Sequence, residues 1–174
     1  ALAGFQVVGP TTNVDFLDRL MGCAAFRNAD LDTGLIERER PALFPAAAPP
    51  SLQRLAQAAA AVLAREANQD DEADARHATG HSDPWAQRNG WRVNGHLVRT
   101  LNFDAGKTRL SVQAQYLPDG YLVSSADGQQ SIRLSSLKLR GTHLTGLAGE
   151  RALAVSTVFA GETLHLFDSA GHLA

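Results

Sequence analysis

The chain has 174 residues, 44% of them hydrophobic, so it is long enough to form one ordinary domain, or a domain with an appendage, around a real core. Its formal net charge of -2 argues against the basic surface of a nucleic-acid-binding protein, and its single cysteine excludes an internal disulfide and a Cys-based zinc site. The sequence contains no signal-peptide pattern and no apolar run of membrane length, so we expect a soluble protein of the bacterial cytoplasm.

A helical pattern runs through the first part of the chain. Thr12 or Asn13 can serve as the N-cap, and Gly22 ends the pattern. A mixed stretch follows and is closed by Pro41. The apolar residues of the first pattern recur at helical spacing: Val14, Leu17, Leu20 and Met21. We predict that residues 1–45 form a helical tail, too short to enclose a core of its own.

A linker and a long apolar helix come next. Residues 46–50 contain two prolines, which cannot continue a helix, and Ser51 follows as an N-cap. Alanines between the larger apolar residues widen the apolar stripe nearly all the way round, and such a helix is generally buried on most sides. Burying the larger side chains gives a gross gain of about 6–12 kcal/mol. We predict a hydrophobic helix over residues 51–67, with its stripe formed by Leu52, Leu55, Ala59, Val62 and Leu63.

Residues 68–90 are polar and acidic at first, and we predict a long loop there. Structureless loops of this length in a compact domain are usually functional or disordered. Trp85 follows Asp83 and Pro84 in this loop, and tryptophan is enriched among the residues that dominate binding interfaces. Trp85 either anchors a partner or holds the loop against the rest of the domain.

From residue 91 onward apolar and polar residues alternate, which is the period of a strand. Turn signals separate the alternating runs, at residues 118–120, 126–128 and 160–162. The alternation slips once, and we place a β-bulge near Ser135 and Ser136. Six to eight short strands of this kind predict an antiparallel meander or barrel, with the apolar helix inside it or against it.

Histidines supply the candidate metal and catalytic groups. His77 and His81 are spaced like helical metal ligands, but they lie in the polar loop, where no helix fixes their geometry. His165 and His172 flank Asp168, but a catalytic triad is defined by geometry, and the sequence has no Gly-x-Ser-x-Gly turn. Gly-rich phosphate loops are absent as well. We therefore predict no catalytic, cofactor-binding or metal-binding residue in this chain.

In the first part of the chain, residues 9–17, Phe26 and residues 32–37 together resemble the end of the biotin carboxylase domain of acyl-CoA carboxylases. Residues 9–17 are similar to that family's Gly-x-Thr-Thr-Asn-hydrophobic-x-Phe-Leu segment. Phe26, followed by the Asp-Thr-Gly-Leu-Ile-Glu of residues 32–37, looks like the tail that closes the domain. The resemblance implies that an ATP-grasp biotin carboxylase precedes residues 1–45 in a longer protein.

The rest of the chain contains motifs that are weak one by one but agree in order, at residues 83–85, 90–94, 116, 119–121 and 163–167. Together they are similar to the BT domain, which links biotin carboxylase to carboxyltransferase in the biotin-containing alpha subunit of 3-methylcrotonyl-CoA carboxylase, an enzyme of leucine catabolism. We expect an α+β fold in which a long helix is surrounded by an antiparallel β-barrel. The BT domain would span residues 46–174, with the helix at 51–67, the loop at 68–90 and the barrel at 91–174.

The resemblance implies a non-catalytic interaction domain that joins its subunit to the carboxyltransferase (beta) subunit and contacts other domains of its own subunit. We hypothesise that the contact residues are Asp83, Pro84, Trp85 and Arg88, since the family uses the loop between the helix and the first strand.

The chain lacks cofactor-binding motifs that the resemblance implies for the full subunit. The family's Ala-Met-Lys-Met biotin site and nucleotide-binding loop are absent, so we expect no cofactor here. Biotin, ATP and Mg²⁺ would belong to the full subunit, an ATP-dependent ligase. Two alternatives stay open: the same domain of a geranyl- or propionyl-CoA carboxylase, and a small-ligand-binding β-barrel, which an empty interior of several hundred Å³ would favour.

Overall fold

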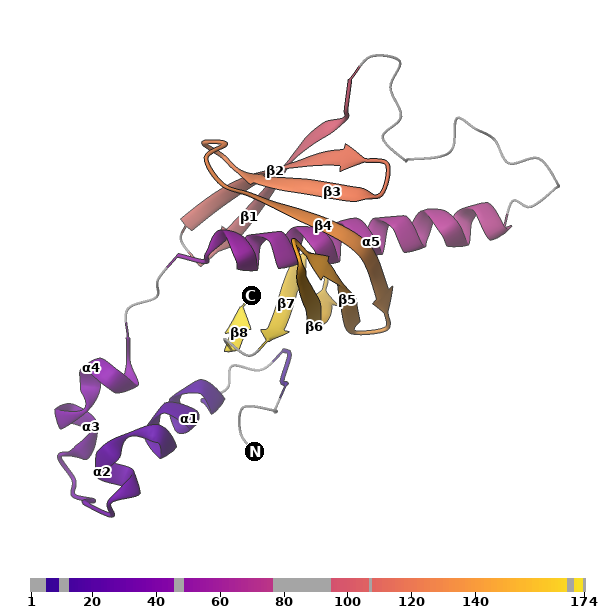
Figure 1. The fold of residues 1–174 in the computed structure, drawn as a ribbon. Helices are drawn as coiled ribbons and strands as arrows, with labels where there is room; N and C mark the ends of the chain where they lie inside the picture. The colour runs from indigo at the N-terminus through magenta and orange to yellow at the C-terminus, as the bar shows by residue number, and fades with distance from the viewer. Residues whose placement is uncertain are drawn as a thin grey trace. The chain divides into compact units, whose positions relative to one another are not determined.

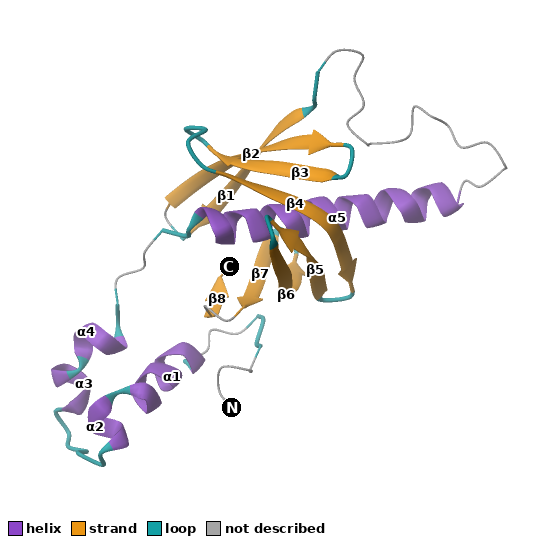
Figure 2. Cartoon of the chain, in the orientation of Figure 1, coloured by secondary structure: helices purple, strands orange, loops and turns teal. Residues whose placement is uncertain are grey.

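A computed structural model describes residues 6–9, 13–45, 49–76, 95–106, 108–168 and 171–173. The chain divides into two compact units (Figure 1). The first comprises residues 1–48 with 169–171, and the second comprises residues 49–168 with 172–174. In the described residues, short helices make up most of the first unit, and one long helix with a β-sheet makes up the second (Figure 2).

The first unit contains four helices within its described residues: α1 (Val14–Gly22), α2 (Ala24–Arg27), α3 (Leu35–Arg38) and α4 (Arg40–Leu43). Helix α1 begins after Asn13 and ends at Gly22, as predicted. The prediction that Pro41 closes this region was wrong, because Pro41 lies in the first turn of α4. Proline is tolerated there because the first N–H groups of a helix have no partner within the helix. Only Leu35 and Leu43 are buried hydrophobic residues in the described part of this unit.

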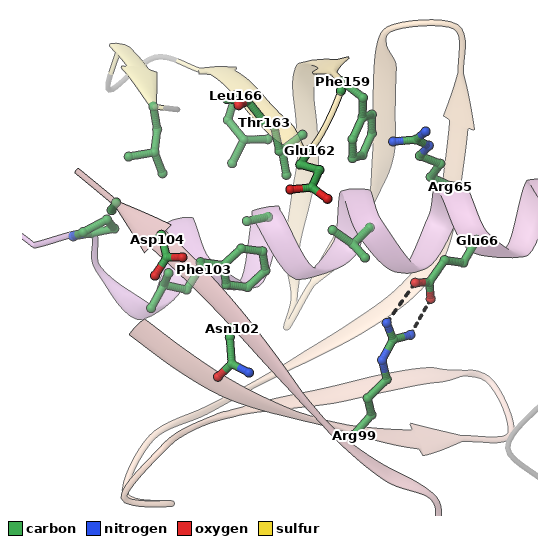
Figure 3. A pocket seen from close by; sticks show the side chains of 18 of the residues that line it. Arg65, Glu66, Arg99, Asn102, Phe103, Asp104, Phe159, Glu162, Thr163 and Leu166 are labelled. Atoms are coloured by element: carbon green, nitrogen blue, oxygen red, sulfur yellow. Dashed lines mark hydrogen bonds and ion pairs between the residues drawn. The ribbon is translucent and has the colours of Figure 1, made fainter. Parts of the chain in front are cut away.

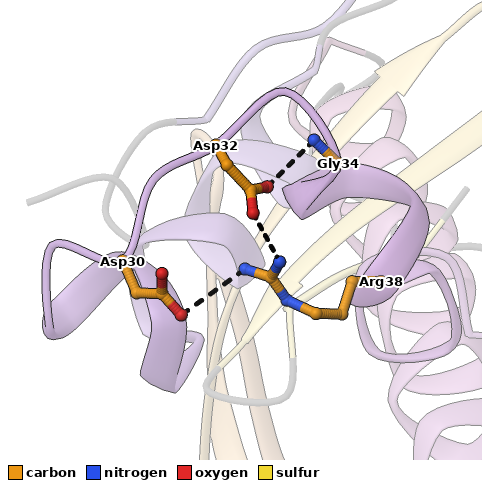
Figure 4. Close-up of polar contacts among 4 residues, drawn as sticks. All are labelled: Asp30, Asp32, Gly34 and Arg38. Atoms are coloured by element: carbon orange, nitrogen blue, oxygen red, sulfur yellow. Dashed lines mark hydrogen bonds and ion pairs between the residues drawn. The ribbon is translucent and has the colours of Figure 1, made fainter.

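A small polar cluster holds the turn before α3. The Asp32 carboxylate accepts hydrogen bonds from the Gly34 backbone N–H at 2.9 Å and from Arg38 Nη1 at 2.8 Å (Figure 4). Arg38 also lies 3.6 Å from Asp30. The hydrogen bond from Arg38 is the main reason that the pKa of Asp32 lies below its usual value of 3.8. These contacts are exposed, so they fix the local geometry more than they stabilise the unit.

Helix α5 (Leu52–Arg76) opens the second unit and is longer than predicted. It begins after Ser51, whose hydroxyl accepts a hydrogen bond from the Arg54 N–H at 3.4 Å. The predicted end near residue 67 was wrong, so the loop predicted from residue 68 is helical as far as Arg76. The acidic residues of this stretch suggested a loop, but Glu, Gln, Ala and Arg are good helix formers, and no glycine or proline interrupts the helix before it ends.

Eight strands form one antiparallel sheet in the described residues, in the order β1 to β8 along the sheet. Their bounds are β1 Val98–Ala105, β2 Thr108–Leu117, β3 Gly120–Ser125, β4 Ser131–Arg140, β5 His143–Ala148, β6 Arg151–Ala160, β7 Thr163–Asp168 and β8 Gly171–Leu173. The sheet curls into a half-barrel, and the predicted α+β class and meander order are confirmed. The three turns predicted from the sequence each join two neighbouring strands.

The predicted bulge is confirmed. The register of β4 against β5 shifts between Ser135 and Lys138. Ser136 adopts a φ of 54°, which lies in the left-handed region that non-glycine residues seldom occupy. Such bulges bend a strand and increase its twist, and β4 curves around α5 (Figure 1).

The core lies between α5 and the concave face of the sheet. Buried residues of α5 and of strands β1 to β7 form one hydrophobic cluster, and α5 contacts β2 to β6. The helix contributes mainly alanines, since Ala56, Ala59, Ala60 and Ala61 are almost completely buried. Small side chains let the sheet approach the helix closely on several sides. Among the described residues, no helix is long and apolar enough to cross a membrane.

Candidate interaction surface

The predicted contact residues Asp83, Pro84, Trp85 and Arg88 lie outside the residues that the structure describes, as do His77 and His81. The structure does describe what flanks that segment. Helix α5 ends at Arg76 before it, and the described chain resumes at Gly95, shortly before β1. The candidate surface is therefore built from the C-terminal part of α5 and the strands beside it.

A bidentate ion pair joins α5 to β1 close to this region. Arg99 on β1 donates two hydrogen bonds to Glu66 on α5, from Nη1 to Oε2 at 2.6 Å and from Nη2 to Oε1 at 2.9 Å (Figure 3). The hydrogen bonds to Glu66 are the main cause of the raised pKa of the Arg99 guanidinium, and Tyr116 adds to it. Two parallel hydrogen bonds fix the relative orientation of the two groups.

Two further contacts hold the same part of the molecule together. Tyr116 on β2 lies directly opposite Tyr121 on β3, with their rings 5.0 Å apart in an edge-to-face arrangement. On the other side of the helix, Asn68 Nδ2 donates a hydrogen bond to the Leu139 carbonyl oxygen at 2.8 Å. Helix α5 is thus attached to β1 and to β4 at residues 66–68, and it continues to Arg76 from a fixed position.

A groove of about 820 Å³ runs along α5, between β1 on one side and β6 to β8 on the other (Figure 3). We call it the α5 groove. Its floor is apolar, with Leu55, Ala58 and Val62 of α5 facing it. Charged residues lie along its rim, and the Arg65 guanidinium stands 4.3 Å above the centre of the Phe159 ring.

The histidines near the end of the chain take part in structural contacts. His165 Nδ1 lies 3.0 Å from His172 Nε2, so the two rings share a hydrogen bond across β7 and β8. The Asp168 carboxylate forms an ion pair with Arg54 at 2.9 Å, between the start of α5 and the end of β7. The described residues contain no group of three or more His, Cys, Asp or Glu side chains placed to hold a metal ion.

The described residues offer a helix attached to the sheet, an apolar groove and a curved sheet. Sequence reasoning missed the pair of Glu66 and Arg99 and the α5 groove. The sequence carries no local signal for the pair, because Arg99 lies at an exposed position of β1 and its partner Glu66 is 33 residues away.

Comparison with a family model and with individual proteins points to the same family. Residues 53–174 match the family model described as the BT domain of the methylcrotonyl-CoA carboxylase alpha subunit.

Three relatives carry the name methylcrotonoyl-CoA carboxylase subunit alpha, mitochondrial. The chain is 27% identical to the protein of Dictyostelium discoideum over 78% of its own length and 18% of the relative's. It is 25% identical to the Mus musculus protein over 97% of this chain and 24% of that protein. It is 28% identical to the Rattus norvegicus protein over 69% of this chain and 17% of that protein. The chain therefore spans between a sixth and a quarter of the relatives that it matches.

Proposed function

Because the chain belongs to the family of BT domains of the methylcrotonyl-CoA carboxylase alpha subunit, we propose that it joins the alpha subunit to a carboxyltransferase (beta) subunit. One observation carries the proposal. Helix α5 is attached to the sheet through Glu66 and Asn68 and continues straight to Arg76, where the segment with the hypothesised contact residues begins. A recognition segment that starts from a fixed helix loses less conformational freedom on binding.

The finer fold that we propose is the one expected of the family, in which the sheet surrounds α5 as a barrel. The shared core supports this, because α5 contributes buried residues on several sides and the sheet curls about it. Such a barrel would serve as a spacer and a docking unit, with α5 as its axis.

We propose that residues 1–45, which make up most of the first unit, are the end of a preceding biotin carboxylase domain. Its described residues bury only two large side chains, whereas Met21, Leu31, Ile36 and Phe44 are each about half exposed. Apolar residues exposed to this extent on small helices are expected to pack against a neighbouring domain.

The whole alpha subunit would use ATP, Mg²⁺ and bicarbonate to carboxylate biotin, and its partner would transfer the carboxyl group to an acyl-CoA. The described residues do not fit a biotin attachment site. Lys138 is the one lysine that the structure describes, and it lies within β4, paired with Thr145 of β5. The bacterial cytoplasmic location stays a prediction, since the relatives are named as mitochondrial.

The small-ligand-binding barrel has one observation in its favour, the volume of the α5 groove. The linking role is supported better, because the alanine-rich face of α5 packs directly onto the concave side of the sheet, where a barrel ligand would lie. The acyl-CoA specificity, whether methylcrotonyl, geranyl or propionyl, would be set by the partner subunit.

Isothermal titration of the 174-residue chain with the carboxyltransferase subunit from the same genome tests the proposal. We expect saturable binding, and we expect Trp85→Ala to weaken it by about 2 kcal/mol, or roughly thirtyfold in Kd, because truncating an interface tryptophan removes a large contact. Trp91→Ala is the matched control and should change Kd little. Equal effects of the two variants would remove Trp85 from the interface, and absence of binding would refute the linking role of this chain.

A further inference from the structure

The last two strands of the sheet bring two histidines together. His165 lies on β7 and His172 on β8, and both residues belong to the second unit (Figure 1). His165 Nδ1 lies 3.0 Å from His172 Nε2, and this contact is exposed to solvent. The two residues are separated by seven positions in the sequence, so it is the pairing of β7 with β8 that makes them neighbours.

The distance between the two nitrogens suits two ligands of one metal ion. Imidazole nitrogens bind transition metals at about 2.0–2.1 Å, so two nitrogens at a right angle on one ion stand about 2.8–3.0 Å apart. Two nitrogens on a tetrahedral ion such as Zn²⁺ stand about 3.3–3.4 Å apart. The separation of 3.0 Å between His165 and His172 therefore fits adjacent positions on a square-planar or octahedral ion best.

The orientation of the two rings requires one adjustment. Their planes differ by 12° and their centroids are 5.2 Å apart, so the two nitrogens face each other and one donates a hydrogen bond to the other. Both lone pairs converge on one ion when the His165 ring turns about its side-chain torsions, which an exposed contact permits. The shared proton then moves to the other nitrogen of its ring, so the neutral pair binds an ion without losing a proton.

Phe167 holds one of the two ligands in place. Its ring stacks on the ring of His172, with centroids 4.5 Å apart and planes 9° apart. A side chain whose ring is already fixed loses less conformational freedom when it binds an ion. His172 is therefore the preorganised ligand, and His165 is the ligand that turns.

Two protein ligands define the class of ion. Neutral imidazole suits Ni²⁺, Cu²⁺ and Zn²⁺, whereas Mg²⁺ and Ca²⁺ prefer oxygen ligands. Among the residues that the structure describes, no group of three His, Cys, Asp or Glu side chains is placed to hold an ion. His143 is too far away to add a third nitrogen, because it lies opposite Ser156 on β6, and Ser156 lies opposite Phe167. Two strand spacings amount to about 10 Å.

We propose that His165 and His172 bind one divalent transition-metal ion, such as Cu²⁺ or Ni²⁺, with water in its remaining positions. The ion fastens β8, which has three residues, to β7 at the end of the sheet. Because the two histidines are held together only when the strands are paired, the ion binds the folded protein in preference and stabilises it. The site is distinct from the hypothesised contact residues 83–88, so it does not depend on the linking role.

Isothermal titration of Ni²⁺ into the 174-residue chain, without a histidine tag, tests the proposal. We expect saturable binding, tighter with Cu²⁺ than with Ni²⁺ and absent with Mg²⁺. His172→Ala should weaken Ni²⁺ binding by at least about tenfold, because the second ligand of a chelate acts at a high effective concentration. His143→Ala is the matched control, an exposed histidine on β5, and should leave Kd unchanged. Equal Kd values for His172→Ala and the parent would show an adventitious ion only and overturn the proposal.

A spectroscopic readout locates the ion. Cu²⁺ is paramagnetic and broadens the NMR signals of nearby nuclei, so the signals of His165, Phe167 and His172 should disappear first in a Cu²⁺ titration. Broadening centred on His77 and His81, with unchanged signals from β7 and β8, would place the ion elsewhere and overturn the assignment.

The melting temperature measures whether the ion fastens β8. Ni²⁺ at about a hundredfold its Kd should raise the melting temperature of the 174-residue chain by roughly 5 °C, because only the folded state offers the paired histidines. His172→Ala should melt like the parent without Ni²⁺ and should gain little when Ni²⁺ is added. An equal rise in the parent and in His172→Ala would contradict the proposed site.

Discussion

Gly120 starts β3 at a point where the sheet leaves no room for a side chain. Its φ is 152°, and a Cβ placed there would overlap the Leu134 carbonyl oxygen on β4. Glycine is required here for two reasons, the backbone conformation and the close approach of the next strand.

We expect Gly120→Ala to lower the free energy of unfolding by about 1–3 kcal/mol, since the strand must shift to relieve the overlap. Gly161→Ala is the matched control, because Gly161 also has a positive φ, of 62°, but an added methyl group there would meet no neighbouring atom within 4 Å. The free energies of unfolding of both variants, measured with denaturant, separate the cost of the positive φ from the cost of the overlap with the Leu134 carbonyl oxygen. A loss no larger at Gly120 than at Gly161 would show that the contact with Leu134 is unimportant.

Asp32 in the first unit should titrate at a lower pH than an ordinary aspartate. Its hydrogen bond from Arg38 favours the charged form, so its pKa in the folded protein lies below 3.8. A lowered pKa means that Asp32 adds stability above its unfolded pKa, and that this stability is lost as the pH falls through the folded pKa.

The NMR chemical shift of the Asp32 carboxyl carbon should therefore report a pKa below 3.8, and Arg38→Gln should raise it toward that value. Arg27→Gln is a control, since within the described residues no ion pair joins Arg27 to Asp32. An unchanged Asp32 pKa in the Arg38 variant would show that the hydrogen bond is not formed in solution.

At the scale of elements, burial of its apolar residues holds α5 against the sheet, in addition to the polar contacts of Glu66 and Asn68. Leu55 is 8% exposed and belongs to the core cluster. Leu55→Asp would bury an unpaired charge, which costs about 3–5 kcal/mol and should prevent cooperative folding of the second unit. Gln53→Asp places the same residue at an exposed position of the same helix and should leave the thermal unfolding transition unchanged. A Leu55→Asp variant that melts like the parent would show that this face of α5 is not buried.

The elements also show how far the sequence alone predicts the fold. Period-two alternation and turn residues predicted the meander, and the slip at Ser135 predicted the bulge, because these signals are local. The end of α5 was missed because acidity was taken as a loop signal, although the stretch contains good helix formers. The pair of Glu66 and Arg99 joins residues 33 positions apart, and no local pattern specifies which charges will meet.

At the scale of the whole molecule, the two units differ in the size of their hydrophobic cores. The second unit has one continuous cluster that joins α5 to seven strands, whereas the described part of the first has two buried leucines and four large apolar side chains that are about half exposed. Stability of small domains rises with the fraction of surface that they bury. We therefore expect the second unit to fold alone, and the first unit to fold stably only when it packs against a neighbouring domain.

Residues 49–174 expressed alone should give a cooperative thermal transition within about 2 °C of that of the 174-residue chain, because the removed residues add little to the core that melts. Residues 1–48 alone should show no cooperative transition. Circular dichroism and differential scanning calorimetry measure both. If residues 49–174 alone show no cooperative transition, the first unit stabilises the second. The boundary between a carboxylase tail and a BT domain at residues 45–46 would then have to be abandoned.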